Sequence, residues 1–335
     1  MTKRPFVSVV MPVYNGGQYL KAAIESILTQ TFKNFELVII NDGSTDQSED
    51  IIKTYQDERV RLISRGNKGL VDTLNEGITK ARGELIARMD ADDISEPTRL
   101  EEQVKFLEKY PDIGLVGTTS FIIREDGRYS HVNPVLTEDQ DLRKAFLVGN
   151  MFVHGSAMVR SDVLKKSGLY RKLALHAEDY DLWVRVAEVS KVANLTNVLY
   201  RWRDNSQGVS QKNLEIQSKS AEAVRARYWD EVSSAGRLPK PSFKESFERR
   251  KFYNSREDKY KDLRLGALSG VSSRYASYLS FVGRVGDARK ELLCAIFYQP
   301  WRVYTYIYPL SFILGPDNFV KLVAWLKELK RKIYR

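Results

Sequence analysis

FVSVVMPVYNGGQYL, residues 6–20, decides the fold, because it joins a strand-like run to a helical pattern through a glycine-containing turn. Valine dominates the run Phe6–Met11, and β-branched residues favour extended chain. Apolar pairs then recur at helical spacing as far as Leu28. Further strand-like runs follow at Phe35–Ile40, Val60–Ser64 and Leu85–Met89, with a second helical pattern over residues 70–81. This alternation predicts an α/β domain with a Rossmann-like, mainly parallel central sheet and flanking helices.

Local signals predict further helices and a hairpin. Ser44-Thr45-Asp46-Gln47 has the spacing of a capping box and predicts a helix start after the second strand. A helix is predicted over Thr98–Lys109, and another after Glu178. The glycine-containing stretch 125–127 predicts a hairpin turn. A polar stretch over 203–212 then marks a boundary, so we predict one domain over 1–212 and a C-terminal helical region over 213–335.

The composition limits the class of protein. The 335 residues are 43% hydrophobic and 29% charged, as in ordinary globular proteins, and the formal net charge is +10. Basic residues concentrate near the C-terminus rather than among aromatics in the N-terminal region, which disfavours nucleic-acid binding. The single cysteine, Cys294, excludes an intramolecular disulfide and fits a reducing cytoplasm. No window has the ~20 apolar residues of a spanning helix. No Gly-x-Gly-x-x-Gly follows the first strand, which disfavours a dinucleotide-dependent enzyme.

An acidic cluster, Asp90-Ala91-Asp92-Asp93, follows a predicted buried strand. Side chains of an extended chain alternate between faces, so Asp90 and Asp92 point to one side and Asp93 to the other. Two crowded carboxylates repel each other unless a cation lies between them, and Mg²⁺ or Mn²⁺ suits such ligands. The alternative is a solvated acidic turn in which Asp93 or Ser95 caps the next helix. The cluster alone leaves both interpretations open.

A second acidic pair, Glu178-Asp179, opens a helix whose apolar residues Leu182 and Trp183 would face the core. Acidic residues in a first helical turn commonly serve only the helix dipole. A carboxylate there could instead act as a general base. The pair by itself does not decide between these roles.

Polar and aromatic residues also follow the other predicted strands, at residues 12–17, 41–44 and 65–69. Ligands of parallel sheets bind beyond the carboxyl ends of the strands, which is where all of these residues fall. The joint pattern resembles family-2 inverting glycosyltransferases of the GT-A fold over roughly residues 6–210. The segments that carry the resemblance are VSVVMPVYNGGQYL, ELVIINDGSTDQS, GNKGLVDTLNEGITKARGELIARMDADD and HAEDYDLWVR.

The resemblance implies a donor half over residues 1–95 and an acceptor half, with the catalytic base, over 96–212. In the donor half, Pro12, Tyr14 and Asp42 would hold the base of the nucleotide. The other implied donor and metal residues are Lys68 and Arg88 on the donor, Asp90 on the ribose or the metal, and Asp92 as principal ligand of Mn²⁺ or Mg²⁺. In the acceptor half, Asp179 would take the proton of the acceptor hydroxyl. Glu178, His154 and Arg185 would contact the acceptor or orient the site.

One segment departs from the family pattern. Many relatives carry a histidine near the metal where Tyr200-Arg201-Trp202-Arg203 places Arg203. An arginine cannot ligate a cation but can pair with a diphosphate, so the metal would have fewer protein ligands. Processive relatives carry Gln-x-x-Arg-Trp, and Val198 stands at the glutamine position here. We therefore expect an enzyme that adds one sugar at a time.

The C-terminal residues 319–333 form an apolar helical stripe with lysines on the other faces, after an aromatic-rich segment over 297–312. This pattern is typical of a helix that lies on a membrane surface. The alternative is a stripe that packs on the catalytic domain or on a twin subunit in a homodimer.

Together, these features predict an inverting, non-processive glycosyltransferase that uses a nucleotide diphosphate sugar, with UDP-sugars favoured. The acceptor would be a hydroxyl of a glycan, lipid-linked, in the synthesis of bacterial cell-surface polysaccharide. The enzyme would be cytoplasmic and peripheral on the inner face of the cytoplasmic membrane. The competing interpretation is a catalytically inactive protein of the same fold that binds nucleotide sugars.

Overall fold

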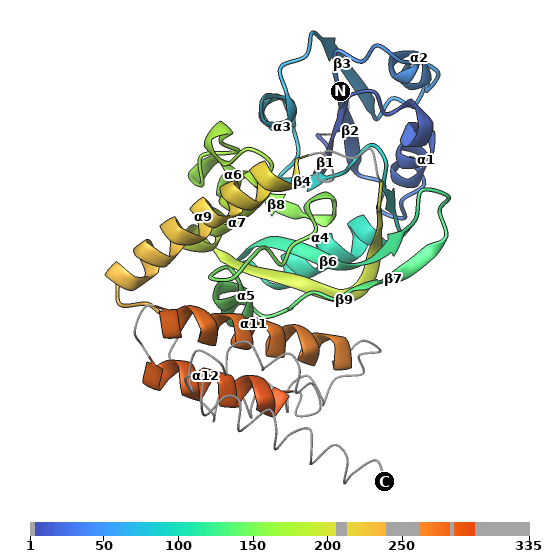
Figure 1. Ribbon diagram of the computed structural model, residues 1–335. Helices are drawn as coiled ribbons and strands as arrows, with labels where there is room; N and C mark the ends of the chain where they lie inside the picture. The colour runs from blue at the N-terminus through green and yellow to red at the C-terminus, as the bar shows by residue number, and fades with distance from the viewer. Residues whose placement is uncertain (1–3, 206–212, 239–260, 282–284, 299–335) are drawn as a thin grey trace. The chain divides into compact units, whose positions relative to one another are not determined.

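The computed structural model describes residues 4–205, 213–238, 261–281 and 285–298 (Figure 1). Contacts group the chain into two compact units, Met1–Tyr228 and Trp229–Arg335, so the division falls inside helix α9 (Leu214–Ser234). The predicted domain boundary at residue 213 stays a prediction. The stripe over residues 319–333 lies outside the described residues.

One nine-stranded sheet runs through the first unit in the order β3-β2-β1-β4-β8-β6-β9-β5, with β7 paired to β6 (Figure 1). Strands β1 to β4 pair in parallel, as the sequence predicts. Beyond β4 the sheet is mixed, because β8 pairs antiparallel with both β4 and β6 while β6 and β9 are parallel. The strands are β1 (Val7–Val13), β2 (Phe35–Asp42), β3 (Val60–Arg65), β4 (Leu85–Arg88), β5 (Ile94–Ser95), β6 (Ile113–Ile123), β7 (Tyr129–Asn133), β8 (Met158–Arg160) and β9 (Lys191–Arg203).

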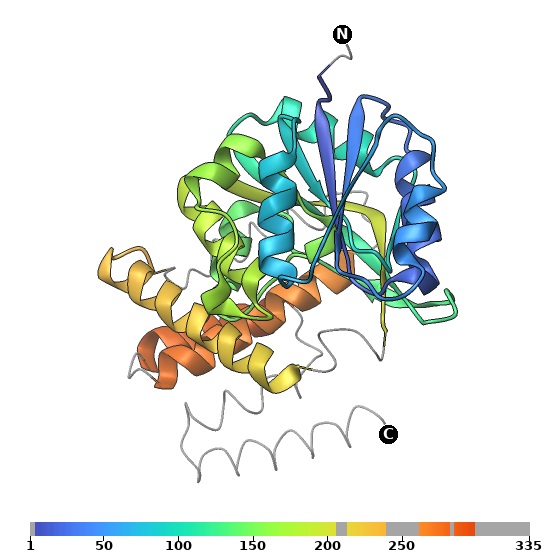
Figure 2. The same cartoon turned by 90° about the horizontal axis from the view of Figure 1, so that it is seen from above.

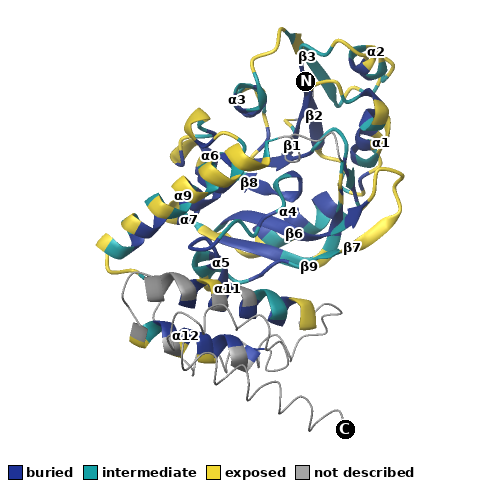
Figure 3. Cartoon of the chain, viewed as in Figure 1, coloured by how far each residue is buried: buried dark blue, intermediate teal, exposed yellow. Residues whose placement is uncertain are grey.

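Helices cover both faces of this sheet. Val9 and Met11 of β1 belong to the core cluster that includes α1 and α4, whereas Val10 faces α3. Figure 2 shows α1 and α3 on opposite sides of the N-terminal strands, and Figure 3 shows the buried strands between them. The helices are α1 (Gly17–Leu28), α2 (Ser48–Lys53), α3 (Leu70–Lys80), α4 (Arg99–Lys109), α5 (Asp139–Ala145), α6 (Ser161–Lys166) and α7 (Glu178–Val189), with short 3₁₀ turns η1 (His154–Ser156) and η2 (Lys172–Ala174).

Most local predictions are confirmed, and one is wrong. The helix after Glu178 is α7, and the hairpin between β6 and β7 turns at Gly127 with φ of 84°. The capping box fails, because α2 begins only at Ser48. Instead, Ser44 Oγ accepts a hydrogen bond from the Asn15 N–H (3.0 Å). This residue therefore ties the loop after β2 to the loop after β1, which stabilises the rim of the sheet.

The second unit contains two described helices, α11 (Lys261–Phe281) and α12 (Val285–Tyr298), which pack against each other. Their contact buries apolar side chains such as Leu268 and Leu292. None of the helices in the described part of the chain is both long and apolar enough to cross a bilayer.

Candidate active site

Asp42 ends β2 and orders the loop that follows β3. Its Oδ1 accepts hydrogen bonds from the Arg65 guanidinium and from the Lys68 N–H (2.8 Å). Its Oδ2 accepts one from the Gly69 N–H (3.0 Å). The side chain of Asp42 is buried, and that of Lys68 is exposed. Asp42 therefore fixes the backbone of this loop, on which the Lys68 side chain is exposed.

Pro12 and Tyr14 lie at the end of β1. Since Val13 pairs in register with Asn41, this end is beside the end of β2, which carries Asp42. Pro12 is buried, whereas the Tyr14 ring is 57% exposed. The fold thus brings together three of the predicted base-binding residues and leaves an aromatic face open to stack on a ligand.

The predicted metal motif follows β4. The buried Arg88 donates from Nη2 to Asp90 Oδ1 (2.7 Å), and Asp92 Oδ2 accepts a hydrogen bond from Asn205 Nδ2 (3.4 Å). Burial raises the pKa of Asp92, and the nearby charge of Asp90 raises it further. Such crowded negative charge favours a cation. The described residues contain no cluster of three or more His, Cys, Asp or Glu side chains suited to a metal. Two carboxylates do fit Mg²⁺ or Mn²⁺ when phosphate oxygens supply further ligands.

Arg203 fixes the acidic loop from its other side. Its backbone N–H donates to Asp93 Oδ1 (2.7 Å), and its Nε donates to the Asp92 carbonyl (2.7 Å). Its Nη1 donates to the Glu125 carbonyl (3.0 Å), and the guanidinium lies 4.2 Å from the centroid of the Tyr19 ring. Arg203 is therefore a buried support of the metal motif. Its pairing with a diphosphate stays a prediction.

Arg99 places a second buried cation beneath the same loop. It is fully buried, and it donates to Ser95 Oγ (2.8 Å) and to the Arg88 carbonyl (2.8 Å). Its guanidinium lies 5.0 Å from the centroid of the Tyr200 ring. Burial lowers the pKa of Arg99 to about 10, so it keeps its charge at neutral pH. This charge partly offsets the acidic cluster above it.

Gly155 allows Tyr200 to approach Asp90 closely. The Tyr200 hydroxyl accepts a hydrogen bond from the Asp90 N–H (3.3 Å). A Cβ on Gly155 would come within 1.9 Å of that hydroxyl oxygen and within 2.7 Å of Asp90 Oδ2. Only glycine fits there, and its neighbour His154 is thereby held near the acidic motif.

Asp179 lies in the first turn of α7 and is half-buried. Its Oδ2 accepts a hydrogen bond from Asn150 Nδ2 (2.8 Å), and its Oδ1 accepts one from the Tyr180 N–H (2.7 Å). Burial and, secondly, the neighbouring charge of Glu178 raise the pKa of Asp179 to about 7. A carboxylate with a pKa near the working pH is well suited to accept a proton in catalysis.

Electrostatic interactions connect the two acidic motifs. Burial raises the pKa of Glu178, while the Arg88 charge lowers it and the Asp90 charge raises it. Burial and the same Arg88 charge lower the pKa of His154 well below its usual value, so His154 is neutral. His154 Nε2 lies 2.8 Å from the Tyr170 hydroxyl oxygen. Arg88 of β4 therefore interacts electrostatically with groups of η1 and α7.

Arg185 holds α7 in place. It pairs with Asp181 (Nη2 to Oδ2, 2.7 Å) and donates to the carbonyls of Ser167 and Leu169. These bonds tie α7 to the loop after α6. Of its two predicted roles, orienting the site is the one that these contacts support.

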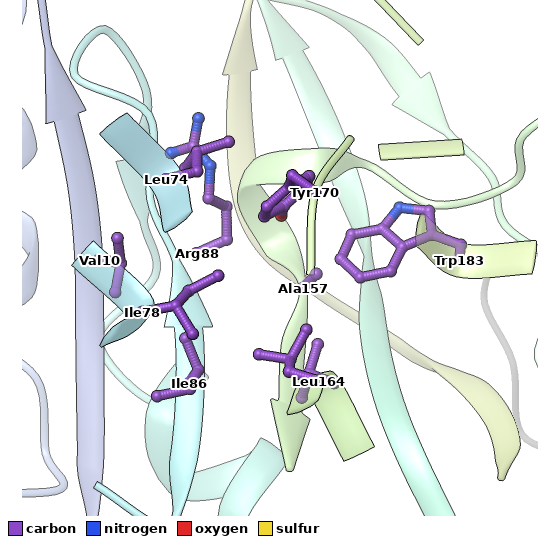
Figure 4. Close-up of a pocket in the computed structure, with 10 residues that line it drawn as sticks. Val10, Leu74, Ile78, Ile86, Arg88, Ala157, Leu164, Tyr170 and Trp183 are labelled. Carbon is purple, nitrogen blue, oxygen red and sulfur yellow. The ribbon is translucent and has the colours of Figure 1, made fainter. Parts of the chain in front are cut away.

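A small cavity lies against Arg88, between α3, β4, β8, α6 and α7 (Figure 4). Its lining is mainly aliphatic, with Tyr170 and Trp183 on the acceptor side. Its volume of about 10 Å³ corresponds to roughly one water molecule. The cavity is therefore a packing defect behind the site and not a sugar pocket.

Three supporting residues escaped the sequence analysis. Asn150 bonds to a carboxylate 29 residues away, and no local motif marks that pairing. Tyr170 resembles an ordinary core aromatic. Arg99 opens an amphipathic helix, where a charged residue is expected to face solvent. The sequence contains one signal that could have pointed to Asn150: it is a polar residue directly before the apolar run over 151–153.

Comparison with known proteins agrees with this geometry. The model of the glycosyl transferase family 2 matches residues 8–168. The chain is 38% identical over 222 residues to the putative glycosyltransferase EpsE of Bacillus subtilis, with 64% of this chain and 78% of EpsE covered. It is 38% identical over 207 residues to an uncharacterized glycosyltransferase of Methanocaldococcus jannaschii, with 60% of this chain and 71% of that protein covered.

Solved structures show the same fold. TarS 1–349 of S. aureus superimposes with a TM-score of 0.54 at 17% identity, covering 92% of each chain. The mannosyltransferase PcManGT of Pyrobaculum calidifontis, solved with GDP-Man and Mn²⁺, gives 0.52 at 19% identity, covering 93% of this chain and 86% of that one. The structural likeness bears on the fold, which is GT-A, and the sequence likeness establishes descent. The chain belongs to glycosyltransferase family 2.

Proposed function

We propose that this glycosyltransferase transfers one sugar at a time from a UDP-sugar to a hydroxyl of a glycan, with inversion at the anomeric carbon. One observation carries the proposal. A half-buried carboxylate with a pKa raised to about 7, Asp179, interacts electrostatically with Glu178 and Tyr170, and both of these groups also interact with Asp90 of the acidic motif. Asp179 is suited to accept a proton, and Asp90 and Asp92 are suited to hold a diphosphate through a cation.

In the proposed reaction, the acceptor oxygen attacks the anomeric carbon while the bond from that carbon to the diphosphate oxygen breaks. The hydroxyl proton passes to Asp179, and the nucleoside diphosphate leaves with the bonding electrons. The hydrogen bond from Asn150 holds the carboxylate of Asp179 in one orientation. Neutral His154 and the buried Glu178 would contact or orient the acceptor. Direct displacement of this kind inverts the configuration.

The donor would bind along the ends of β1 and β2. Tyr14 offers an exposed ring to the base, and Asp42 Oδ2, which accepts a single hydrogen bond within the described residues, retains a lone pair for a base N–H. Exposed Lys68 and the buried Arg88 would attract the phosphates. TarS, which shares the fold, has been solved with UDP and with UDP-GlcNAc, which supports a uridine nucleotide.

A divalent cation, Mn²⁺ or Mg²⁺, would be held by Asp92 and by Asp90 Oδ2, since Asp90 Oδ1 accepts the hydrogen bond from Arg88. When bound, such a cation neutralises the charge on the departing diphosphate. The raised pKa of Asp92 supports this assignment, as does the Mn²⁺ in the structure of PcManGT. Arg203 and Arg99 would keep the acidic loop rigid whether or not the cation is present.

We propose a lipid-linked glycan as acceptor, at the inner face of the cytoplasmic membrane, in bacterial cell-surface polysaccharide synthesis. The net charge of +10 and the basic, amphipathic pattern over residues 319–333 support contact with an anionic membrane surface. The alternative for that stripe is packing on the protein or on a twin subunit.

A donor screen tests this function. The protein is incubated with UDP-, GDP- and dTDP-sugars and Mn²⁺, and the release of nucleoside diphosphate is measured. We expect slow hydrolysis of one UDP-sugar, with water replacing the acceptor. If nucleotide sugars raise the melting temperature but none is turned over, with or without glycan acceptors, the protein is the inactive binder instead.

A further inference from the structure

Helix α9 contacts both sides of the turn that carries Asp179. Gln217 donates from Nε2 to the His176 carbonyl (3.0 Å), just before α7 begins. Arg227 donates from Nη1 to Asp181 Oδ1 (2.7 Å), within the first turn of α7. All these residues belong to the first compact unit. The peptide from His176 to Asp181 is therefore held at both ends by one helix.

A ring contact adds to this attachment. The Tyr228 ring of α9 packs edge-on against Phe146, with centroids 6.3 Å apart. The Phe146 carbonyl in turn accepts a hydrogen bond from the Tyr180 hydroxyl. Tyr180 is adjacent to Asp179, and its N–H donates to that carboxylate. Tyr180, which follows Asp179 in α7, thus has an indirect contact with α9 through Phe146.

The backbone before α7 needs such restraint. His176 has φ of 63°, in the left-handed region that residues with a side chain rarely adopt. A strained residue keeps its conformation only when its surroundings fix it. The hydrogen bond from Gln217 is the contact that holds the His176 carbonyl. Without it, we expect His176 to relax and Asp179 to gain access to water.

Asp181 is a rigid anchor for the same turn. It is fully buried, and burial would raise its pKa, but hydrogen bonds from Arg171, Arg227 and Arg185 lower the pKa to about 2. Loss of Arg227 would leave two guanidinium groups on the carboxylate. A variant at this position therefore removes the link to α9 without leaving a buried charge unpaired.

We propose that Gln217 and Arg227 are positioning residues for the transfer reaction, which fix the direction of the Asp179 carboxylate by holding His176 and Asp181 on either side of it. The inference rests on the proposed function, in which Asp179 is the base. It extends the working site to a helix that lies outside the matched family segment, which ends at residue 168.

Five single variants test this role. Gln217→Met keeps the length of the side chain and removes the donor, and its control is Ser218→Met on the exposed neighbouring residue. Arg227→Met removes the link to Asp181, and its control is Lys219→Met, which removes an exposed cation of the same helix. The kcat and the donor KM of each are measured from pH 5 to 9, beside the melting temperature. Arg227→Lys tests for rescue.

We expect Gln217→Met and Arg227→Met to lower kcat by roughly 10- to 100-fold with little change in the donor KM, because misplacing a catalytic group by about 1 Å has effects of that size. Asp179 interacts with the titratable groups of Glu178 and Tyr170 and accepts hydrogen bonds from Asn150 and the Tyr180 N–H, and neither variant replaces any of these residues. Greater hydration in Gln217→Met should lower the pKa of Asp179 and move the acidic limb of kcat to lower pH. Arg227→Lys should restore part of the activity, and both controls should match the wild type.

Two results would overturn the inference. One is wild-type kcat in both variants. The other is a fall in kcat that follows the melting temperature while the acidic limb stays in place, since that result would mean that α9 only stabilises the fold. Asp179→Asn is measured in parallel. If it transfers sugar normally, the proposed base is wrong, whereas its inactivity beside active Gln217→Met and Arg227→Met refutes only the role of α9.

Discussion

Asp179→Asn should lower kcat by roughly 10²- to 10⁴-fold, because the amide cannot accept the acceptor proton. Donor affinity should change little, since the nucleotide would bind along β1 and β2 and not at α7. The measurement compares sugar transfer with donor binding for wild type and variant. A matched control is Asp162→Asn, which changes an exposed carboxylate of α6 paired with Lys166. Wild-type transfer by the variant would show that Asp179 only begins a helix.

Asp179 also determines how activity and stability should depend on pH. As a base, Asp179 works only when ionised, so the activity of the wild type should rise through about pH 7. The folded chain holds this proton more tightly than the unfolded chain, whose pKa is near 3.8. The stability from Asp179 is therefore present below pH 4 and is lost as the pH rises through 7. The melting temperature of Asp179→Asn minus that of the wild type should accordingly increase as the pH rises from 5 to 8.

Asp92→Asn should lower turnover by about 10²-fold or more, because a charged ligand to the cation beside the leaving group is lost. Binding can be followed without turnover. Mn²⁺ in the presence of UDP should raise the melting temperature of the wild type, and this rise should vanish in Asp92→Asn. Asp126→Asn, which alters an exposed carboxylate of the β6–β7 hairpin, serves as the control. The assignment of Asp92 as a metal ligand would be refuted if the wild type turned over equally fast in excess EDTA and in Mn²⁺. It would also be refuted if Mn²⁺ with UDP stabilised the wild type and Asp92→Asn equally.

The sequence was most informative where structure is determined locally. The valine-rich run at Phe6–Met11 and the glycine-containing loop after it predict the first strand and helix, because β-branched residues and turn residues act within a few positions. The mixed half of the sheet depends on pairings such as Ile94 with Arg201 and Leu85 with Arg160. No short window contains such information, so only the resemblance to a family predicted that half.

The same distinction applies to the site. Asp90, Asp92 and Asp179 belong to short motifs, so the sequence alone singled them out. The place of Arg203 in a motif predicts a contact with the diphosphate, which stays a prediction, and it gives no sign of the bonds from its Nε and Nη1 to backbone carbonyls. Arg99 is charged and fully buried, whereas arginine side chains are mostly exposed in proteins. Burial of a charge depends on partners far along the chain, which pattern analysis does not detect.

The measurement that tests the central claim most directly is the configuration of the sugar as it leaves the donor. The UDP-sugar that the screen selects is hydrolysed slowly by the wild type in the NMR tube, and the anomeric signal of the first free sugar is recorded before mutarotation. A single displacement assisted by Asp179 predicts that an α-linked donor gives the β sugar first, and that Asp179→Asn releases it far more slowly. Release of the α sugar first, or equal rates for the two proteins, would contradict the account.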